Sequence, residues 1–123
     1  MKTILTIFLN MAIILTSLQA VEQHGKASIY STSCNGGSQT ASGVRLKNDS
    51  NMVAHKTLPF GTKVKITNVS NGKTSEAIVV DRGPFVRGRI IDVTRLVAQQ
   101  LGFSYKQGIA KVKIEVIGKI KLK

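Results

Sequence analysis

Short runs of alternating polar and apolar residues, separated by glycine-containing turns, limit the fold of this chain more than any other feature. Residues 62–69 (TKVKITNV) and 110–117 (AKVKIEVI) alternate strictly, which is typical of strands with one buried face. An Asn71–Gly72 pair, typical of a tight hairpin turn, separates the first of these from the return strand at 75–80. Three more segments are strand-like: 25–30, 52–55 and 89–91. The pattern predicts a small, mostly antiparallel barrel.

One helix is expected between the last two strands. Residues 95–101 can form it, Gly102 supplies its stop signal, and either Asp92 or Thr94 can cap its start. A carboxylate at a helix start accepts hydrogen bonds from unpaired backbone N–H groups, and that role alone would explain Asp92.

Residues 1–20 have the pattern of a secretory signal peptide. Lys2 is followed by a mostly apolar run from Ile4 to Leu15, which is shorter than the roughly 20 apolar residues that a membrane span requires. We therefore expect one exported domain at residues 21–123. Its single cysteine, Cys34, has no partner for an internal disulfide and no neighbour that would activate it, and we interpret it as an ordinary thiol.

The chain is strongly basic, with a formal net charge of +12 among its 123 residues. Such a surface favours acidic partners, including nucleic acid, phospholipid and an anionic cell wall. Export argues against nucleic acid, and the lysines follow the strands without interleaved aromatic residues. The charge therefore predicts weak binding to something acidic.

Few side chains are available for acid–base chemistry. The chain has six carboxylates and two histidines, and most of them fall near the expected cleavage site, in loops or at solvent-facing strand positions. Three remain: His55, Asp81 and Asp92. Asp81 follows a buried strand, where partial desolvation suits a general acid, although an aspartate there could equally bond the backbone of the following turn. His55 borders apolar residues and could be a packed histidine.

No cofactor or metal is expected. Histidine, cysteine and acidic residues do not occur with the spacing of metal ligands, and no glycine-rich phosphate-binding pattern precedes a helix. A Ser/His/acid triad cannot be argued either, because the sequence identifies no partners for His55.

Seven segments together resemble the RlpA-like (rare lipoprotein A) double-psi β-barrel family. The most specific are AHKTLPFGT at 54–62, DRGPF at 81–85 and GRIID, the start of GRIIDVT at 88–94. The others are GKASIY at 25–30, TASG at 40–43, VKITN at 64–68 and GIAKV at 108–112. The resemblance covers residues 25–117.

This resemblance implies a mostly β fold, a six-stranded double-psi β-barrel with one or two short helices. It also implies an endolytic peptidoglycan lytic transglycosylase that favours glycan strands without stem peptides. Asp81 becomes the expected general acid/base and His55 its partner, with Asp92 ranked behind them. The residues expected to bind substrate are Tyr30, Ser42, Gly43, Arg82 and Phe85.

The sequence departs from the family pattern at Val44, where family members commonly carry the glutamate of TASGE. The loss of that polar group leaves a second interpretation open, an expansin-like protein that binds or loosens the wall without cutting it. The family's lipid-attachment cysteine and wall-binding repeat are not found, so we expect a monomer in the periplasm or secreted, without a lipid anchor. Its expected partner is the glycan strand itself.

Two enzyme mechanisms fit the few acids. A lytic transglycosylase needs one acid, which protonates the glycosidic oxygen and then accepts the proton of the sugar's own C6 hydroxyl. An inverting hydrolase needs two carboxyls with a water between them, and Asp81 with Asp92 could form such a pair. A secreted barrel that serves as an interaction module is the remaining hypothesis.

Overall fold

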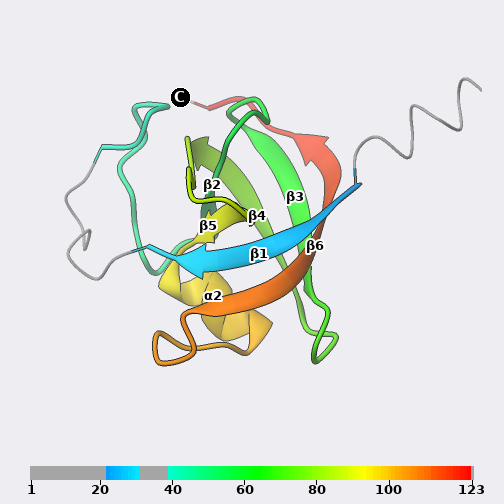
Figure 1. Cartoon of the computed structure of the whole chain (residues 1–123). Helices are drawn as coiled ribbons and strands as arrows, with labels where there is room; N and C mark the ends of the chain where they lie inside the picture. Colours follow the sequence, from blue (N-terminus) through cyan, green and yellow to red (C-terminus); the bar gives the residue numbers. More distant parts are fainter. Residues whose placement is uncertain (1–21, 31–38, 123) are drawn as a thin grey trace, which may run out of the picture.

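The computed structural model describes residues 22–30 and 39–122, which form one closed six-stranded β-barrel with a helix at its side (Figure 1). The strands are β1 (Glu22–Ile29), β2 (Met52–His55), β3 (Thr62–Asn68), β4 (Thr74–Asp81), β5 (Arg89–Val93) and β6 (Ile109–Lys119). The helix is α2 (Arg95–Leu101). The predicted signal peptide at 1–20 and Cys34 lie outside the described residues.

The order of neighbouring strands around the barrel is β1-β5-β2-β4-β3-β6. Two neighbouring pairs, β1–β5 and β2–β4, are parallel, and the other pairs are antiparallel. A parallel pair joins strands that are distant in the chain, because its two members must be connected by a crossover. The predicted six-stranded barrel is confirmed, and it is mostly antiparallel.

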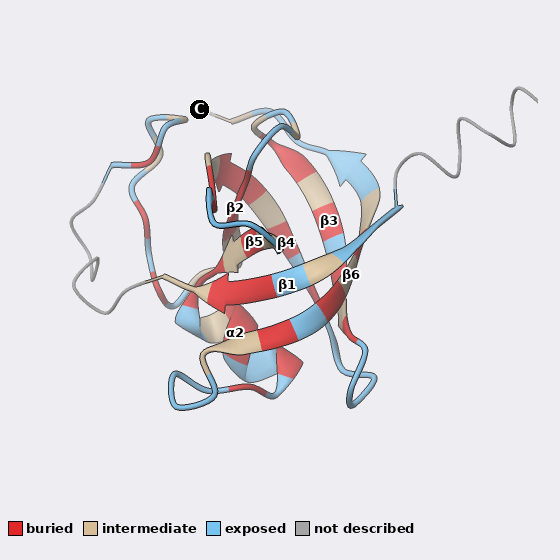
Figure 2. Cartoon of the chain, in the orientation of Figure 1, coloured by how far each residue is buried: buried red, intermediate tan, exposed pale blue. Residues whose placement is uncertain are grey.

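Alternation along the strands builds the core. Buried and exposed positions follow one another along β3 and much of β6, as Figure 2 shows. The inward residues are mostly aliphatic, and the fully covered ones include Val53, Val64, Ile66, Val79, Ile91, Val93, Val112 and Ile114. Burying one such side chain stabilises the fold by about 1.5–3 kcal/mol.

The predicted helix is confirmed at Arg95–Leu101, and Gly102 ends it with a left-handed backbone (φ 76°). The capping role expected for Asp92 is wrong: Asp92 lies inside β5, and Thr94 occupies the N-cap position. Asn68 Nδ2 and Asn71 Nδ2 donate to Leu101 O at 2.9 and 3.1 Å, which ties the end of α2 to the β3–β4 hairpin. No helix among the described residues is long and apolar enough to cross a bilayer.

The predicted hairpin is confirmed, whereas the first strand differs from its prediction. The Asn71–Gly72 pair lies in a five-residue connection, since β3 ends at Asn68 and β4 begins at Thr74; Gly72 supplies its positive φ of 77°. Glu22 and His24, expected beside a cleavage site, lie in β1 and pair with β6.

Candidate active site

A row of four residues crosses the wall of the barrel and brings two aspartates onto one face. Ser28 on β1 is opposite Asp92 on β5, Asp92 is opposite Ala54 on β2, and Ala54 is opposite Asp81 on β4. Residues directly opposite each other in a sheet project from the same face. We call these four residues the aspartate row.

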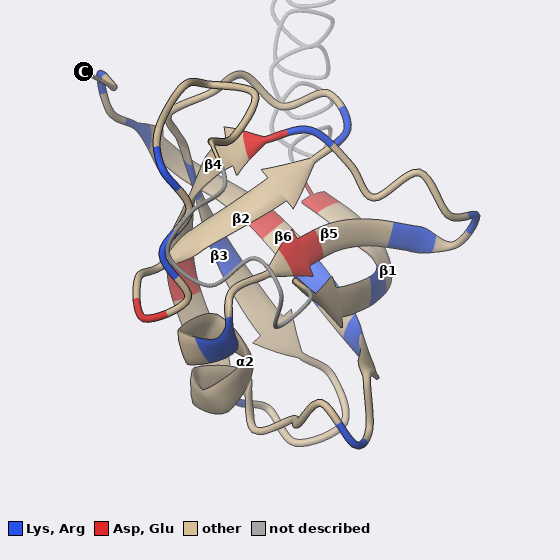
Figure 3. Ribbon diagram, turned by 90° about the vertical axis from the view of Figure 1, so that its left-hand side faces the viewer, with Lys and Arg blue, Asp and Glu red and all other residues tan. Residues whose placement is uncertain are grey.

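The aspartate row faces away from the core. The residues that precede three of its members along their strands, Ala27, Val53 and Ile91, are fully buried in the core, and successive side chains alternate between faces. Asp81 and Asp92 are half-buried. Two strand spacings, about 10 Å in all, separate their backbones, with only the small side chain of Ala54 between them. In Figure 3, acidic segments mark β4 and β5 on either side of β2.

Asp81 is held by groups from outside its own turn. Its Oδ1 accepts a hydrogen bond from the backbone N–H of Ala41 at 2.9 Å, and its Oδ2 accepts one from the hydroxyl of Tyr30 at 3.1 Å. The alternative role considered for it, bonding the backbone of residues 83–85, is therefore not the one that these contacts describe. Tyr105 donates in turn to Tyr30 O at 3.2 Å.

The TASG segment builds the turn that presents Ala41 to Asp81. Thr40 closes the turn, because its N–H and hydroxyl both donate to Val44 O, at 3.0 and 2.6 Å. Gly43 has a φ of 89°, which favours glycine, and the N–H of Ser42 anchors the turn to Val80 O at 3.1 Å. The side chains of Thr40 and Ser42 bond each other at 2.9 Å. The polar residues of this motif thus shape a loop against the end of β4.

The carboxyl of Asp92 has a pKa that its surroundings raise. Burial raises the pKa of its carboxyl, and the charge of Asp81 acts in the same direction. A hydrogen bond from the hydroxyl of Ser28 to Oδ1 and the charge of Arg89 lower the pKa in part, but burial prevails. A raised pKa favours retention of a proton, as a general acid requires.

His55 is not hydrogen-bonded to Asp81. Its Nδ1 accepts the backbone N–H groups of Thr57 and Leu58 at 3.1 and 3.0 Å, so the proton of the neutral ring is on Nε2, which bonds Gln23 Oε1 at 2.8 Å. His55 follows Ala54 along β2, and alternation directs it to the other side of that strand from the aspartate row. Burial and the charges of Arg82 and Lys56 lower the pKa of His55.

Arg82 and Phe85 lie on the turn after Asp81. The guanidinium of Arg82 donates to Leu58 O at 2.8 Å and to His55 O at 3.2 Å, and it stacks 4.0 Å from the ring centre of Phe60. Arg82 therefore fixes the LPF turn and is directed away from the carboxyl of Asp81. Phe85 is 78% exposed and leaves an aromatic face open to solvent.

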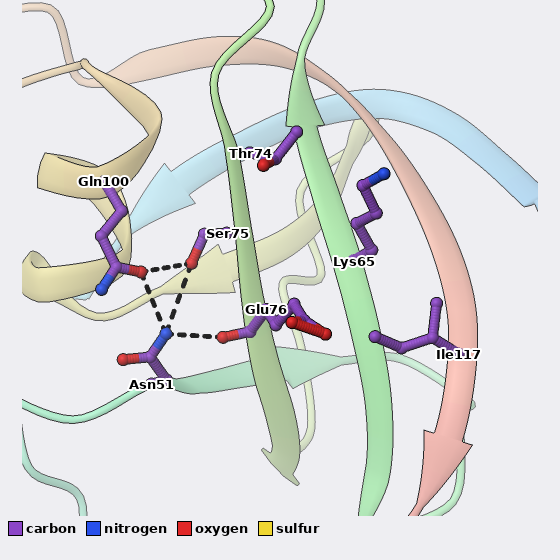
Figure 4. Close-up of a pocket in the computed structure, with 7 residues that line it drawn as sticks. All are labelled: Asn51, Lys65, Thr74, Ser75, Glu76, Gln100 and Ile117. Atoms are coloured by element: carbon purple, nitrogen blue, oxygen red, sulfur yellow. Dashed lines mark hydrogen bonds between the residues drawn. The ribbon is translucent and has the colours of Figure 1, made fainter.

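A hollow of about 550 Å³ lies elsewhere, beside the start of β4 (Figure 4). Its amide and hydroxyl groups bond one another: Asn51 Nδ2 donates to Glu76 O and Gln100 Oε1 at 2.5 and 3.0 Å, and Ser75 Oγ donates to Gln100 Oε1 at 2.5 Å. These contacts join the residue before β2 to β4 and α2. The polar side chains of the hollow therefore have a structural role. None of the predicted site residues lines it.

No metal-binding group emerges from residues 22–30 and 39–122, where no three His, Cys, Asp or Glu side chains are grouped to hold an ion. Sequence reasoning missed Ser28 and Ala54 as members of this row, because only the strand register brings them beside the aspartates.

Comparison with known proteins places this geometry in context. A family model described as lytic transglycolase matches residues 22–114. The endolytic peptidoglycan transglycosylase RlpA of Neisseria meningitidis serogroup A is 47% identical over 95 residues, which cover 77% of this chain and 39% of that protein. The protein of the same name from Rickettsia felis is 44% identical over 103 residues, covering 82% of this chain and 45% of that one. The chain thus spans less than half the length of these relatives.

Solved structures share the fold at low sequence identity. The Streptomyces papain inhibitor superposes with a TM-score of 0.61 at 20% identity, over 79% of this chain and 94% of the inhibitor. An apo expansin from Clavibacter michiganensis gives a TM-score of 0.62 at 21% identity, over 81% of this chain and 52% of the expansin. These likenesses concern the fold of the barrel.

Proposed function

Because this chain belongs to the lytic transglycolase family of RlpA-like double-psi β-barrels, we propose that it cleaves the glycan strands of peptidoglycan. The observation that carries this proposal is the aspartate row, which projects two half-buried carboxyls from one face of the barrel. The names of the relatives support endolytic transglycosylation as the reaction.

The two aspartates divide the proton transfers of the reaction between them. Asp92, whose pKa is raised, holds a proton and donates it to the glycosidic oxygen as the bond to C1 breaks. The C6 hydroxyl of the same muramic residue attacks C1, and Asp81 accepts the proton which that hydroxyl loses. The products are a free hydroxyl on the leaving sugar and a 1,6-anhydro-muramic end, and no water is consumed.

The environment of each carboxyl supports this division. Both oxygens of Asp81 accept hydrogen bonds, from Ala41 N–H and the Tyr30 hydroxyl, and a carboxylate is an acceptor at both oxygens. On Asp92 the Ser28 hydroxyl donates to Oδ1, so that Oδ2 is the oxygen that carries the transferable proton. The family resemblance ranked Asp81 first, with His55 as its partner and Asp92 behind them, whereas the geometry supports a role shared by the two aspartates.

The residues expected to bind substrate receive specific roles in this proposal. The exposed ring of Phe85 stacks on a sugar face, while Tyr30 and the Ser42–Gly43 turn fix Asp81 and border the bound strand. Arg82 and His55 act at a distance, by holding the LPF turn in place. We further propose that the domain at 21–123 is exported after removal of residues 1–20, and that it acts as a monomer on strands free of stem peptides.

A second candidate function is binding or loosening of the wall without cleavage. It is favoured by Val44, whose backbone carbonyl closes the turn beside Asp81 and whose side chain is apolar where the family pattern has a carboxylate. This candidate uses the same face of the barrel and differs from the first only in the absence of bond cleavage.

Mass spectrometry of peptide-free glycan strands after incubation tests the proposal. The wild-type protein is expected to produce anhydro-muramic ends, and Asp81→Asn and Asp92→Asn each to reduce their rate of appearance at least a hundredfold. Asp49→Asn, an exposed aspartate in a loop, is the matched control and keeps the wild-type rate. An Asp92→Asn variant with full activity would return the chemistry to Asp81 alone. Binding to sacculi with no new ends would establish the second candidate.

A further inference from the structure

A second row of side chains, all of them cationic, lies beside the aspartate row. Lys26 on β1 is opposite Arg89 on β5 and, on its other side, opposite Lys111 on β6. We call Arg89, Lys26 and Lys111 the cation row. Figure 3 shows basic segments on β1 and at the start of β5.

The cation row shares the outer face of the barrel with the aspartate row. Lys26 and Ser28 are two residues apart on β1, with the fully buried Ala27 between them, so both project outward about 7 Å apart. Between β1 and β5 the register shifts by one residue, and the extra residue, Ile90, packs against the core. This bulge returns Arg89 to the outer face, where its charge acts on Asp92.

Ile90 can reach the core because residue 25 is a glycine. A Cβ at Gly25 would lie 2.7 Å from Ile90 Cγ2, closer than real side chains approach. The bulge, and with it the outward placement of Arg89, therefore depends on the close packing of Ile90 against Gly25.

No carboxylate side chain forms an ion pair within 4 Å with the cation row, although the charge of Arg89 acts on Asp92 from a greater distance. All six carboxylate side chains of the sequence belong to the described residues, and their ion pairs within 4 Å join Glu22, Glu76 and Glu115 to other cations. Like charges directly opposite each other destabilise a sheet. Three cations in one unpaired row are thus unfavourable for folding and available to an external anion.

A hollow of about 360 Å³ adjoins the row and supplies contact area. Lys26 and Lys111 border it, and Val69, Gly88 and Val112 contribute apolar and backbone surface, together with His24 and Gly25. Cations at the rim of a partly apolar hollow suit a ligand that combines an acidic group with the C–H faces of a sugar ring.

We propose that the cation row binds the carboxylate groups of an acidic glycan, the lactyl carboxylates of muramic residues that carry no stem peptide. The inference rests on the proposed function, since it describes how the same strand is held beside the aspartates. Arg89 and Asp92 are opposite Lys26 and Ser28, so the bulge keeps the two rows about 7 Å apart along the strands. The long side chains of the cation row extend this reach toward the next repeat of the glycan. A carboxylate one repeat away from the cleaved bond would then reach the row.

Binding to matched glycans tests this assignment. The probes are peptide-free glycan strands prepared with an amidase, and the same strands after carbodiimide coupling has converted their carboxylates into primary amides. All proteins carry Asp81→Asn, so that binding is measured without cleavage. The row variant is Lys26→Gln/Arg89→Gln/Lys111→Gln. The control, Lys65→Gln/Lys119→Gln/Lys121→Gln, removes the same charge from exposed positions elsewhere. Lys65 is on β3, which lies across the barrel from β5, Lys119 is the last residue of β6, and Lys121 follows that strand.

The row variant is expected to bind the carboxylate strands about tenfold more weakly or worse, and the control within about threefold of the parent. Amidated strands should bind the parent and the row variant equally, and added salt should remove the difference on native strands. Equal loss in the row and control variants would overturn the proposal, as would equal binding of the parent to both kinds of strand.

Folding and catalysis are separated from this result by two further measurements. Removal of opposed like charges should leave the thermal midpoint of the row variant unchanged or higher. The single variant Lys26→Gln tests binding at the central position of the row with only one side chain changed. Chains with native Asp81 report cleavage independently. Preferential binding of carboxylate strands without new glycan ends would contradict the proposed cleavage reaction and support carboxylate binding by the cation row. Cleavage at the same rate of carboxylate and amidated strands would contradict carboxylate binding by the cation row and support the cleavage reaction.

Discussion

At the scale of single residues, Asp92 and His55 show opposite effects of burial on charge. Burial raises the pKa of Asp92 and lowers the pKa of His55, because in both cases the charged form loses solvation. Asp92 is therefore an acid suited to hold a proton, while His55 is held neutral by the two backbone N–H groups that its Nδ1 accepts. The two side chains also change stability with pH in different ranges.

Replacement of Asp92 by asparagine should stabilise the protein at neutral pH. A carboxyl whose pKa is raised on folding favours the folded state at pH values below its unfolded pKa, near 4, and this contribution is lost as pH rises through the folded value. Thermal midpoints are measured for both proteins from pH 3 to 8. Near pH 8 the midpoint of Asp92→Asn should therefore be higher than that of the wild type. A lower midpoint at neutral pH would show that the charge of Asp92 stabilises the fold.

The histidine gives the converse pH dependence. Since the pKa of His55 is lowered on folding, its contribution to stability is present above the unfolded value, near 6.5, and is lost as pH falls through the folded value. His55→Asn, which retains an acceptor for the turn, should flatten the decline in thermal midpoint between about pH 6.5 and 4. His24→Asn, at an exposed position, is the control and should keep that decline. An unchanged decline in His55→Asn would assign the acid sensitivity to another group.

At the scale of elements, the end of α2 depends on the β3–β4 hairpin. Asn68 is only 3% exposed and donates from Nδ2 to Leu101 O, one of the carbonyls that a helix end leaves without a partner. Its Oδ1 also accepts the N–H of Ser70 within the hairpin turn. One side chain thus joins a hairpin to a helix that is seven residues long.

Loss of that side chain should be more harmful than loss of its exposed neighbour. Asn68→Ala is expected to lower the free energy of unfolding by about 1–3 kcal/mol, because it leaves a buried carbonyl with a missing donor. Asn71→Ala, which removes the exposed donor to the same oxygen, should have an effect below about 1 kcal/mol. Denaturant titration measures both. Similar losses in the two variants would mean that burial of Asn68 does not set the strength of the contact.

At the scale of the whole molecule, local patterns predicted the strands and distant pairing decided the site. Alternation located β3 and β6, the Asn71–Gly72 pair located β4, and Gly102 located the end of α2, because these signals depend on neighbouring residues. The pattern predicted a mostly antiparallel barrel, but the parallel pairs β1–β5 and β2–β4 have no local signature, and the six-stranded double-psi form came from family resemblance. These same pairs place Ser28, Ala54 and the two aspartates in one row.

The same reason explains which site predictions changed. Asp81 was found because it follows an apolar strand. Asp92 remained after the other carboxylates were set aside, and its position in β5 rather than at the helix start was not foreseen. His55 was paired with Asp81 on resemblance, whereas its ring contacts Gln23 and the turn at 57–58. The contact with Gln23 joins β1 to β2, which are not neighbours in the barrel, and no sequence spacing indicates it.

The central claim, that the aspartate row transfers protons while the sugar's own C6 hydroxyl attacks, is tested most directly by the fate of water oxygen. Peptide-free glycan strands are incubated with the protein in water enriched in heavy oxygen, and the new ends are analysed by mass spectrometry. The account predicts anhydro-muramic ends without heavy oxygen. Reducing ends that carry heavy oxygen would contradict it and would make Asp81 and Asp92 the acid and base of a hydrolase.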